Sequence, residues 1–168
     1  MNVDVAGAPN CRAINHKVLS LAREIRPDIV LLHGTWEKYF DHVAETVTAL
    51  KQQTSARVIV LGAVPVPNEV LRYFMPRDRL IPQRSLRAEP DWTAAILCAK
   101  LEPSGAEFIS AWDAMCDADG CLTRIGGTAS DISASDQVHL TEKGSKFLIN
   151  SIADRLLGGP AAPSGKPN

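Results

Sequence analysis

Stripes of apolar residues at helical spacing alternate with short, unbroken apolar runs along this chain, and this alternation limits the folds that it can adopt. The runs Ile29–Leu32 and Val58–Leu61 are rich in β-branched residues and are typical of strands buried on both faces. A shorter strand is expected at 108–109. Apolar residues at helical spacing lie in residues 14–25, 43–50, 92–99 and 148–156. The alternation predicts a three-layer α/β/α fold with a parallel sheet.

Length and charge exclude several classes of protein. The 168 residues suit one ordinary domain, and we expect a folded part over residues 1–157 and a disordered Gly- and Pro-rich tail over residues 158–168. The formal net charge is -1, whereas a nucleic-acid partner would require a strongly basic surface. The apolar runs are far shorter than the ~18 residues that a membrane-spanning helix needs. We therefore expect no nucleic-acid partner and no transmembrane segment.

Two of the four cysteines, Cys116 and Cys121, enclose a short loop that contains two aspartates and a glycine. Such a loop suits a tight reversal of the chain, so a disulfide is sterically plausible and would imply an oxidising compartment. Two free thiols in a cytosolic loop are the alternative. A zinc site is not expected, because zinc needs roughly four ligands and no second well-spaced pair accompanies these cysteines.

The strongest indication of chemistry is the pair Asp136 and His139, in a polar loop directly before the last expected helix. An aspartate three residues before a histidine can accept the proton of one imidazole nitrogen, which leaves the other nitrogen free to take a proton from a nucleophile. Thr141 is the expected N-cap of the helix. In α/β folds, ligands bind at such strand-to-helix loops. An exposed loop in which the two side chains merely lie close is the alternative.

The segment Asp136-x-x-His139-Leu140-Thr141-x-x-Gly144 resembles the last conserved block of the SGNH hydrolases, which are also called the GDSL family. Further segments are similar to the SGNH domains that are fused to acyltransferase-3 membrane proteins, and the resemblance covers about residues 9–157. These segments are Cys11-x-x-x-Asn15, the stretch from Pro27 to Trp36 with Tyr39, the stretch from Val58 to Pro65, and the pair Cys116 and Cys121.

The resemblance implies a Ser-His-Asp triad in which His139 is the general base and Asp136 orients it. It implies that Gly34 and Trp36 stand where ordinary SGNH enzymes carry a Gly-x-Asn oxyanion block, and we expect them to bind substrate; a buried structural Trp36 is the alternative. The family acts on acyl esters, commonly acetyl groups on cell-surface glycans, outside the cytoplasmic membrane. The implied partners are an acylated glycan or acyl donor and a membrane acyltransferase domain, and no cofactor or metal is implied.

The sequence departs from the family at the nucleophile, because it contains no Gly-Asp-Ser. We therefore expect that the first strand, the nucleophile loop and the first helix lie upstream of Met1, and that this chain carries only the histidine and aspartate of the triad. Cys11 is expected to be unpaired if Cys116 joins Cys121. A catalytically inactive SGNH-like module that binds glycan or a partner acyltransferase is the alternative, and a cytosolic flavodoxin-like regulator is a third interpretation.

Overall fold

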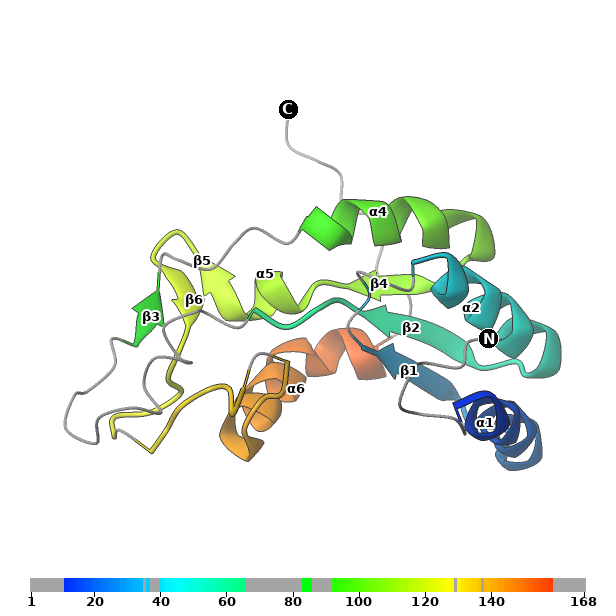
Figure 1. The fold of residues 1–168 in the computed structure, drawn as a ribbon, viewed down its shortest axis with the longest axis horizontal. Coiled ribbons are helices and arrows are strands. Elements are labelled where there is room, and N and C mark those ends of the chain that lie inside the picture. The colour runs from blue at the N-terminus through cyan, green and yellow to red at the C-terminus, as the bar shows by residue number, and fades with distance from the viewer. Residues whose placement is uncertain are drawn as a thin grey trace. The chain divides into compact units, whose positions relative to one another are not determined.

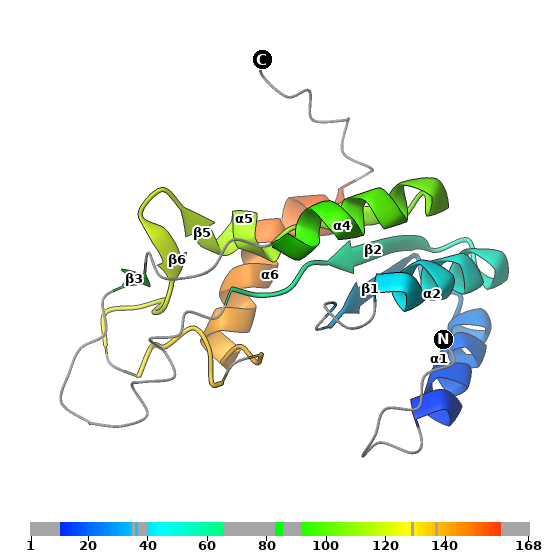
Figure 2. The ribbon, with the colours of Figure 1, turned by 45° about the horizontal axis from the view of Figure 1, so that its top comes forward.

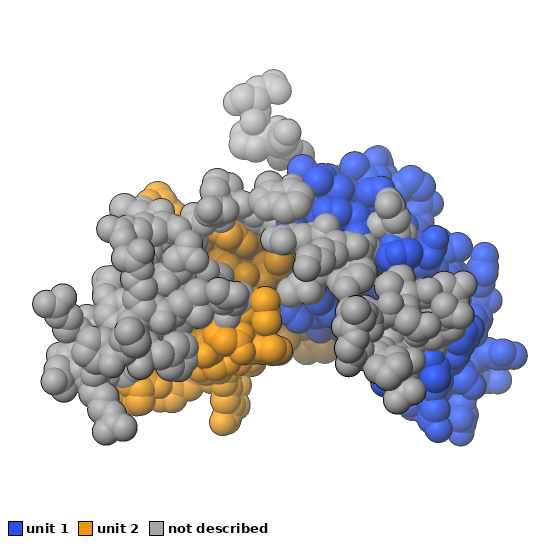
Figure 3. Space-filling model, viewed as in Figure 1, with its two compact units in different colours: residues 1–62, 92–109 blue, residues 63–91, 110–168 orange. Residues whose placement is uncertain are grey.

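The computed structural model describes residues 11–34, 36, 40–65, 83–85, 92–128, 130–136 and 138–158, without the side chains of Cys11, Arg12, Asp41, Ser85 and Trp92. The chain divides into two compact units (Figure 3). Unit 1 comprises residues 1–62 and 92–109, and unit 2 comprises residues 63–91 and 110–168.

Unit 1 is built on a parallel sheet of three strands, with β2 in the middle (Figure 1). The strands are β1 (Ile29–His33), β2 (Arg57–Leu61) and β4 (Glu107–Ile109). Parallel neighbours need crossover connections, and these contain α2 (Phe40–Gln53) between β1 and β2, and α4 (Trp92–Leu101) followed by the 3-10 helix η2 (Glu102–Ser104) between β2 and β4. The predicted α/β class with a parallel sheet and helices is confirmed.

Three helices cover one face of this sheet. Helix α2 packs against both α1 (Cys11–Ile25) and α4, as Figures 1 and 2 show. Side chains alternate between the two faces of a strand, so Val58 and Val60 of β2 point to the same face and enter one core with α2 and α4. The buried members of this core are Trp36, Val43, Val47, Leu50, Val58, Val60, Leu97 and Leu101.

The sequence predicted more burial at the start of unit 1 than the structure shows. Leu31 of β1 is exposed, although the unbroken apolar run predicted burial on both faces. Among the described strands, β1 lies at one edge of the sheet and pairs only with β2, so fewer residues surround it than surround β2. The apolar stripe of α1 is also 44% to 63% exposed, because α1 packs on the core through Leu19 and Ala22 instead. The stripe consists of Ile14, Val18, Leu21 and Ile25.

Unit 2 combines a small antiparallel sheet with a long helix. Its elements are β3 (Arg84–Ser85), α5 (Ala111–Met115), β5 (Cys116–Asp117), β6 (Gly120–Leu122) and α6 (Glu142–Leu157). Strand β6 pairs with both β3 and β5, and α5 packs against α6. The hydroxyl of Thr141 accepts a hydrogen bond from the backbone N–H of Gly144, which confirms the predicted N-cap of α6.

The sequence also indicates a short helix at 69–74 and an exposed excursion at 76–90. These two segments and the expected tail lie outside the described residues, apart from residues 83–85 and residue 158.

Candidate active site

Asp136 and His139 meet in the loop before α6, as their spacing predicted. His139 Nδ1 lies 2.7 Å from Asp136 Oδ2. The other carboxylate oxygen, Oδ1, accepts hydrogen bonds of 2.8 Å from the backbone N–H groups of Val138 and His139. One oxygen of Asp136 therefore shapes the turn of the backbone, and the other orients the imidazole ring.

The electrostatics of this turn assign the two imidazole nitrogens different tasks. The backbone N–H of Val138, followed by the contact with His139, holds the pKa of the Asp136 carboxyl below its ordinary value. An ionised carboxylate only accepts hydrogen bonds, so Nδ1 of a neutral His139 must carry the proton. Nε2 then has a free lone pair, as a general base requires.

The histidine and the aspartate are both largely open to solvent, since their side chains are 71% and 51% exposed. An exposed ion pair contributes little to stability because water screens it. The contact between Asp136 and His139 therefore adds little to the stability of the loop, and the loop needs backbone hydrogen bonds of its own to hold both side chains in position.

That backbone forms a small closed hairpin. The N–H of Ser135 donates to the carbonyl of His139 at 2.8 Å, and Ala134 forms an antiparallel bridge with Leu140. At the base of the hairpin, the N–H of Thr141 donates to the carbonyl of Ser133 at 3.0 Å. Because Thr141 is also the N-cap of α6, the hairpin continues directly into the helix.

Gly144 lets the first turn of α6 come close to this hairpin. A Cβ atom at position 144 would lie 2.0 Å from the carbonyl oxygen of Ser133, and Gly144 is buried. A side chain of any size would therefore push α6 away from the base of the hairpin. This close approach gives a physical reason for the glycine at the end of the D-x-x-H-L-T-x-x-G segment.

The structure brings the other two predicted site residues, Gly34 and Trp36, together in unit 1. Trp36 is only 9% exposed and belongs to the core, and its Nε1 donates to the carbonyl of Leu61 at 2.8 Å. A Cβ atom at Gly34 would lie 3.7 Å from the indole ring, an ordinary contact. These contacts show the structural role of Trp36, whereas substrate binding by Gly34 and Trp36 stays a prediction.

The Trp36→Phe variant tests the structural role. It keeps most of the buried ring but removes the donor to Leu61, and an unsatisfied buried carbonyl costs about 1–3 kcal/mol. We expect urea denaturation to show a loss of free energy of unfolding in that range. Trp112→Phe on α5, where the tryptophan is half-buried, is the control; an equal loss in both variants would contradict the assigned hydrogen bond.

Residues 2–154 match the family model described as SGNH domain (fused to AT3 domains). The chain belongs to this SGNH family. No curated protein matches it. Among solved structures, the periplasmic domain of a lipopolysaccharide acetyltransferase of Salmonella ser. Paratyphi A is similar, with a TM-score of 0.73 and 24% sequence identity. The alignment covers 86% of this chain and 62% of that domain, so this chain spans less than two thirds of the neighbour's length, and the likeness confirms the fold.

The part of the SGNH domain that the structure describes contains no group of three or more His, Cys, Asp or Glu side chains placed to hold a metal ion. None of the described helices combines the length and the apolar character needed to cross a bilayer.

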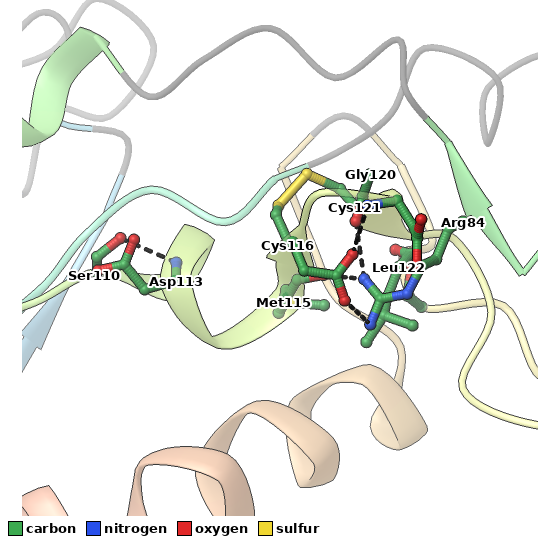
Figure 4. The surroundings of a disulfide bond; sticks show 11 residues. Arg84, Ser110, Asp113, Met115, Cys116, Gly120, Cys121 and Leu122 are labelled. Atoms are coloured by element: carbon green, nitrogen blue, oxygen red, sulfur yellow. Dashed lines mark hydrogen bonds and ion pairs between the residues drawn. A yellow bond between two sulfur atoms is a disulfide. The ribbon is translucent and has the colours of Figure 1, made fainter.

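A disulfide joins Cys116 and Cys121 in this SGNH domain, so the predicted bond is confirmed and the alternative of two free thiols is wrong (Figure 4). The bond connects residues that pair directly between β5 and β6. Arg84 of β3 adds polar contacts to the same hairpin, with Nη1 2.7 Å from the carbonyl of Gly120 and Nη2 2.9 Å from Asp117 Oδ2. The predicted pairing state of Cys11 concerns a side chain outside the described residues.

Sequence reasoning missed a buried carboxylate next to the candidate site. Asp131, with its side chain 8% exposed, forms an ion pair with Lys143 in the first turn of α6. Asp131 Oδ2 also accepts from the N–H of Thr128 at 2.8 Å. The Lys143 ammonium, followed by Thr128, lowers the pKa of Asp131 to about 2. No spacing in the sequence marks this pair, because its residues lie in different structural elements.

Because of the ion pair between Asp131 and Lys143, the free energy of unfolding of the SGNH domain should depend on pH in the acid range. The pKa of Asp131 in the folded chain is below its ordinary value of 3.8, so the ionised carboxyl stabilises the fold above pH ~4. This stabilisation is lost as the pH falls from ~4 to ~2. We expect urea midpoints to drop in this window, and to drop less in Asp131→Asn. The exposed Asp119→Asn is the control, and an equal drop in all three proteins would contradict the assignment.

Proposed function

We propose that this SGNH domain supplies the histidine and the aspartate of a Ser-His-Asp triad that moves acyl groups on a cell-envelope glycan. The observation that carries the proposal is the 2.7 Å contact between His139 Nδ1 and Asp136 Oδ2. This contact leaves Nε2 as the proton acceptor on a largely exposed ring, where a hydroxyl group can approach it.

In the proposed reaction, Nε2 of His139 takes the proton of a serine hydroxyl while the serine oxygen bonds to the acyl carbon. The same nitrogen returns the proton to the departing alkoxide as the original ester bond breaks. An acceptor hydroxyl of the glycan, or water, then loses its proton to Nε2 and bonds to the acyl carbon of the acyl-serine. The same nitrogen returns this proton to the serine oxygen as the acyl–serine bond breaks. Asp136 keeps the ring oriented and stabilises the imidazolium. The 168 residues contain no Gly-Asp-Ser, so we place the nucleophile outside this sequence.

Several observations support the substrate class and the compartment. The family is described as fused to AT3 domains, and the structural neighbour is the periplasmic domain of a lipopolysaccharide acetyltransferase. The Cys116–Cys121 disulfide fits an oxidising compartment. We therefore propose an acylated glycan or acyl donor as substrate, a membrane acyltransferase domain as partner, and a location on the periplasmic or extracytoplasmic side of the membrane.

A binding module without catalytic activity is the second candidate, and the absence of Gly-Asp-Ser from the sequence favours it. Such a module would hold glycan or dock on a membrane acyltransferase domain. Because neither task needs a proton acceptor, replacement of His139 would leave acylation of the glycan intact.

Acylation in cells distinguishes the two candidates. The natural protein and its variants are expressed in a strain that lacks its own copy, and O-acyl groups on the surface polysaccharide are measured by proton NMR. We expect Asp136→Asn and His139→Ala to lose these groups. His42→Ala is a matched control, because His42 also lies near a carboxylate three residues away, Glu45, at 3.3 Å on α2. Acylation retained in both site variants would favour the binding module.

A further inference from the structure

The part of the chain that holds the His139 turn in place lies beside the turn and is buried. Ser133 and Ala134 are fully buried, whereas Asp136 and His139 are mostly open to solvent. Burying a hydroxyl is unfavourable unless it forms hydrogen bonds. An alanine would fill nearly the same space as Ser133 without that penalty, so the hydroxyl itself needs an explanation.

Ser133 forms hydrogen bonds in two directions. Toward the small sheet, its Oγ donates to the carbonyl of Leu122 at 2.8 Å, and its N–H donates to the carbonyl of Thr123 at 2.8 Å. Toward the site, its carbonyl accepts from the N–H of Thr141 at 3.0 Å, while the Thr141 hydroxyl donates to the neighbouring carbonyl of Ile132 at 2.6 Å and lies 3.3 Å from that of Ser133. Ser133 therefore connects the end of β6 with the base of the His139 hairpin.

Covalent and polar contacts fix the end of β6. Leu122 directly follows Cys121, whose disulfide joins β6 to β5. Arg84 donates to the carbonyl of Gly120, the residue that precedes Cys121 (Figure 4). A continuous series of covalent and hydrogen bonds thus runs from the disulfide through Leu122 and Ser133 to Thr141, two residues after His139.

We propose that Ser133 is a positioning residue that links the Asp136–His139 turn to the disulfide-bonded hairpin β5–β6, and so sets the orientation of the imidazole. This inference rests on the proposed function, because the orientation of His139 matters only if the ring accepts a proton during the reaction. The inference also assigns a role to the disulfide, which fixes the position of β6 and thereby of Ser133. Neither role could be predicted from the D-x-x-H spacing.

Nitrogen NMR of the His139 ring tests the proposal without substrate or nucleophile. In the natural chain, at a pH at which the ring is neutral, we expect the proton mostly on Nδ1, facing Asp136. In Ser133→Ala the ring signals shift toward the Nε2-protonated form that a free histidine side chain prefers, and the amide of His139 exchanges with solvent about five- to tenfold faster. Ser151→Ala is the control, because Ser151 also donates to a backbone carbonyl, that of Phe147, at 2.9 Å on α6.

Reduction of the disulfide in the natural chain is the second test, and it applies even if Ser133→Ala does not fold. We expect reduction to change the His139 ring signals in the same direction, while the amide of Gly62 in unit 1, which donates to Ile109 at 2.8 Å, keeps its exchange rate. Unchanged ring signals in a folded Ser133→Ala chain, or after reduction, would overturn the proposal. If the ring responds but His139→Ala keeps full acylation in cells, the positioning role stands and the proposed triad fails.

Discussion

Replacement of His139 by alanine is expected to lower the rate constant for acyl transfer by about 10²–10⁴-fold, in a protein that carries this domain together with its nucleophile. In the proposed triad, the variant removes the proton acceptor at Nε2, so the serine hydroxyl would have to lose its proton to water. Asp136→Asn is expected to cause a smaller loss, since the ring remains but the asparagine amide no longer favours a proton on Nδ1.

Hydrolysis of p-nitrophenyl acetate gives a direct measurement of this effect. We expect kcat to fall with little change in KM, because in the proposed mechanism His139 acts on the proton in the transition state and does not hold the ester in the ground state. His42→Ala, in the other unit, should leave both constants unchanged. Equal activity of His139→Ala and the natural protein would remove His139 from the mechanism.

Substitution of Gly144 by alanine is expected to lower the free energy of unfolding by about 1–3 kcal/mol, because it overfills a packed site. The new Cβ would lie 2.0 Å from the carbonyl oxygen and 2.9 Å from the carbonyl carbon of Ser133, and both are backbone atoms that a side-chain rotation cannot move aside. The higher helix propensity of alanine offsets at most about 1 kcal/mol of this loss. The displaced Ser133 should also disturb the His139 turn, so acyl transfer falls together with stability.

Gly127→Ala provides the matched control for this substitution. A Cβ atom there would meet nothing within 4 Å, so we expect its stability to stay within about 0.5 kcal/mol of the natural chain. Chemical denaturation of both variants measures the difference. If Gly144→Ala were as stable as Gly127→Ala, the close approach of α6 to Ser133 would not be required.

The sequence predicted the positions of the main strands better than their burial in the fold. The apolar run at Val58–Leu61 gave the position of the central strand correctly, because a strand buried on both faces has a distinctive composition. The same argument failed at Ile29–Leu32, since composition does not reveal that β1 lies at an edge of the described sheet. Strands of two or three residues, such as β5 and β6, are too short to have a periodicity, and only the paired cysteines indicated a reversal of the chain there.

At the candidate site, the local contacts could be predicted and the tertiary contacts could not. The Asp136–His139 contact and the Thr141 cap join residues only three positions apart, so their spacing carries the information. Ser133 binds Leu122 eleven residues away, and Asp131 binds Lys143 twelve residues away. These contacts exist because the chain folds back on itself, and the sequence around Ser133 and Asp131 contains no pattern that indicates it.

The exposed stripe of α1 gives the isolated polypeptide an apolar surface patch that favours self-association. Its residues Ile14, Val18, Leu21 and Ile25 place aliphatic carbon in contact with water. Hydrophobic attraction between such patches on separate molecules weakens on cooling. Cold and dilute samples therefore keep the molecules dispersed, whereas warm, concentrated ones favour clusters.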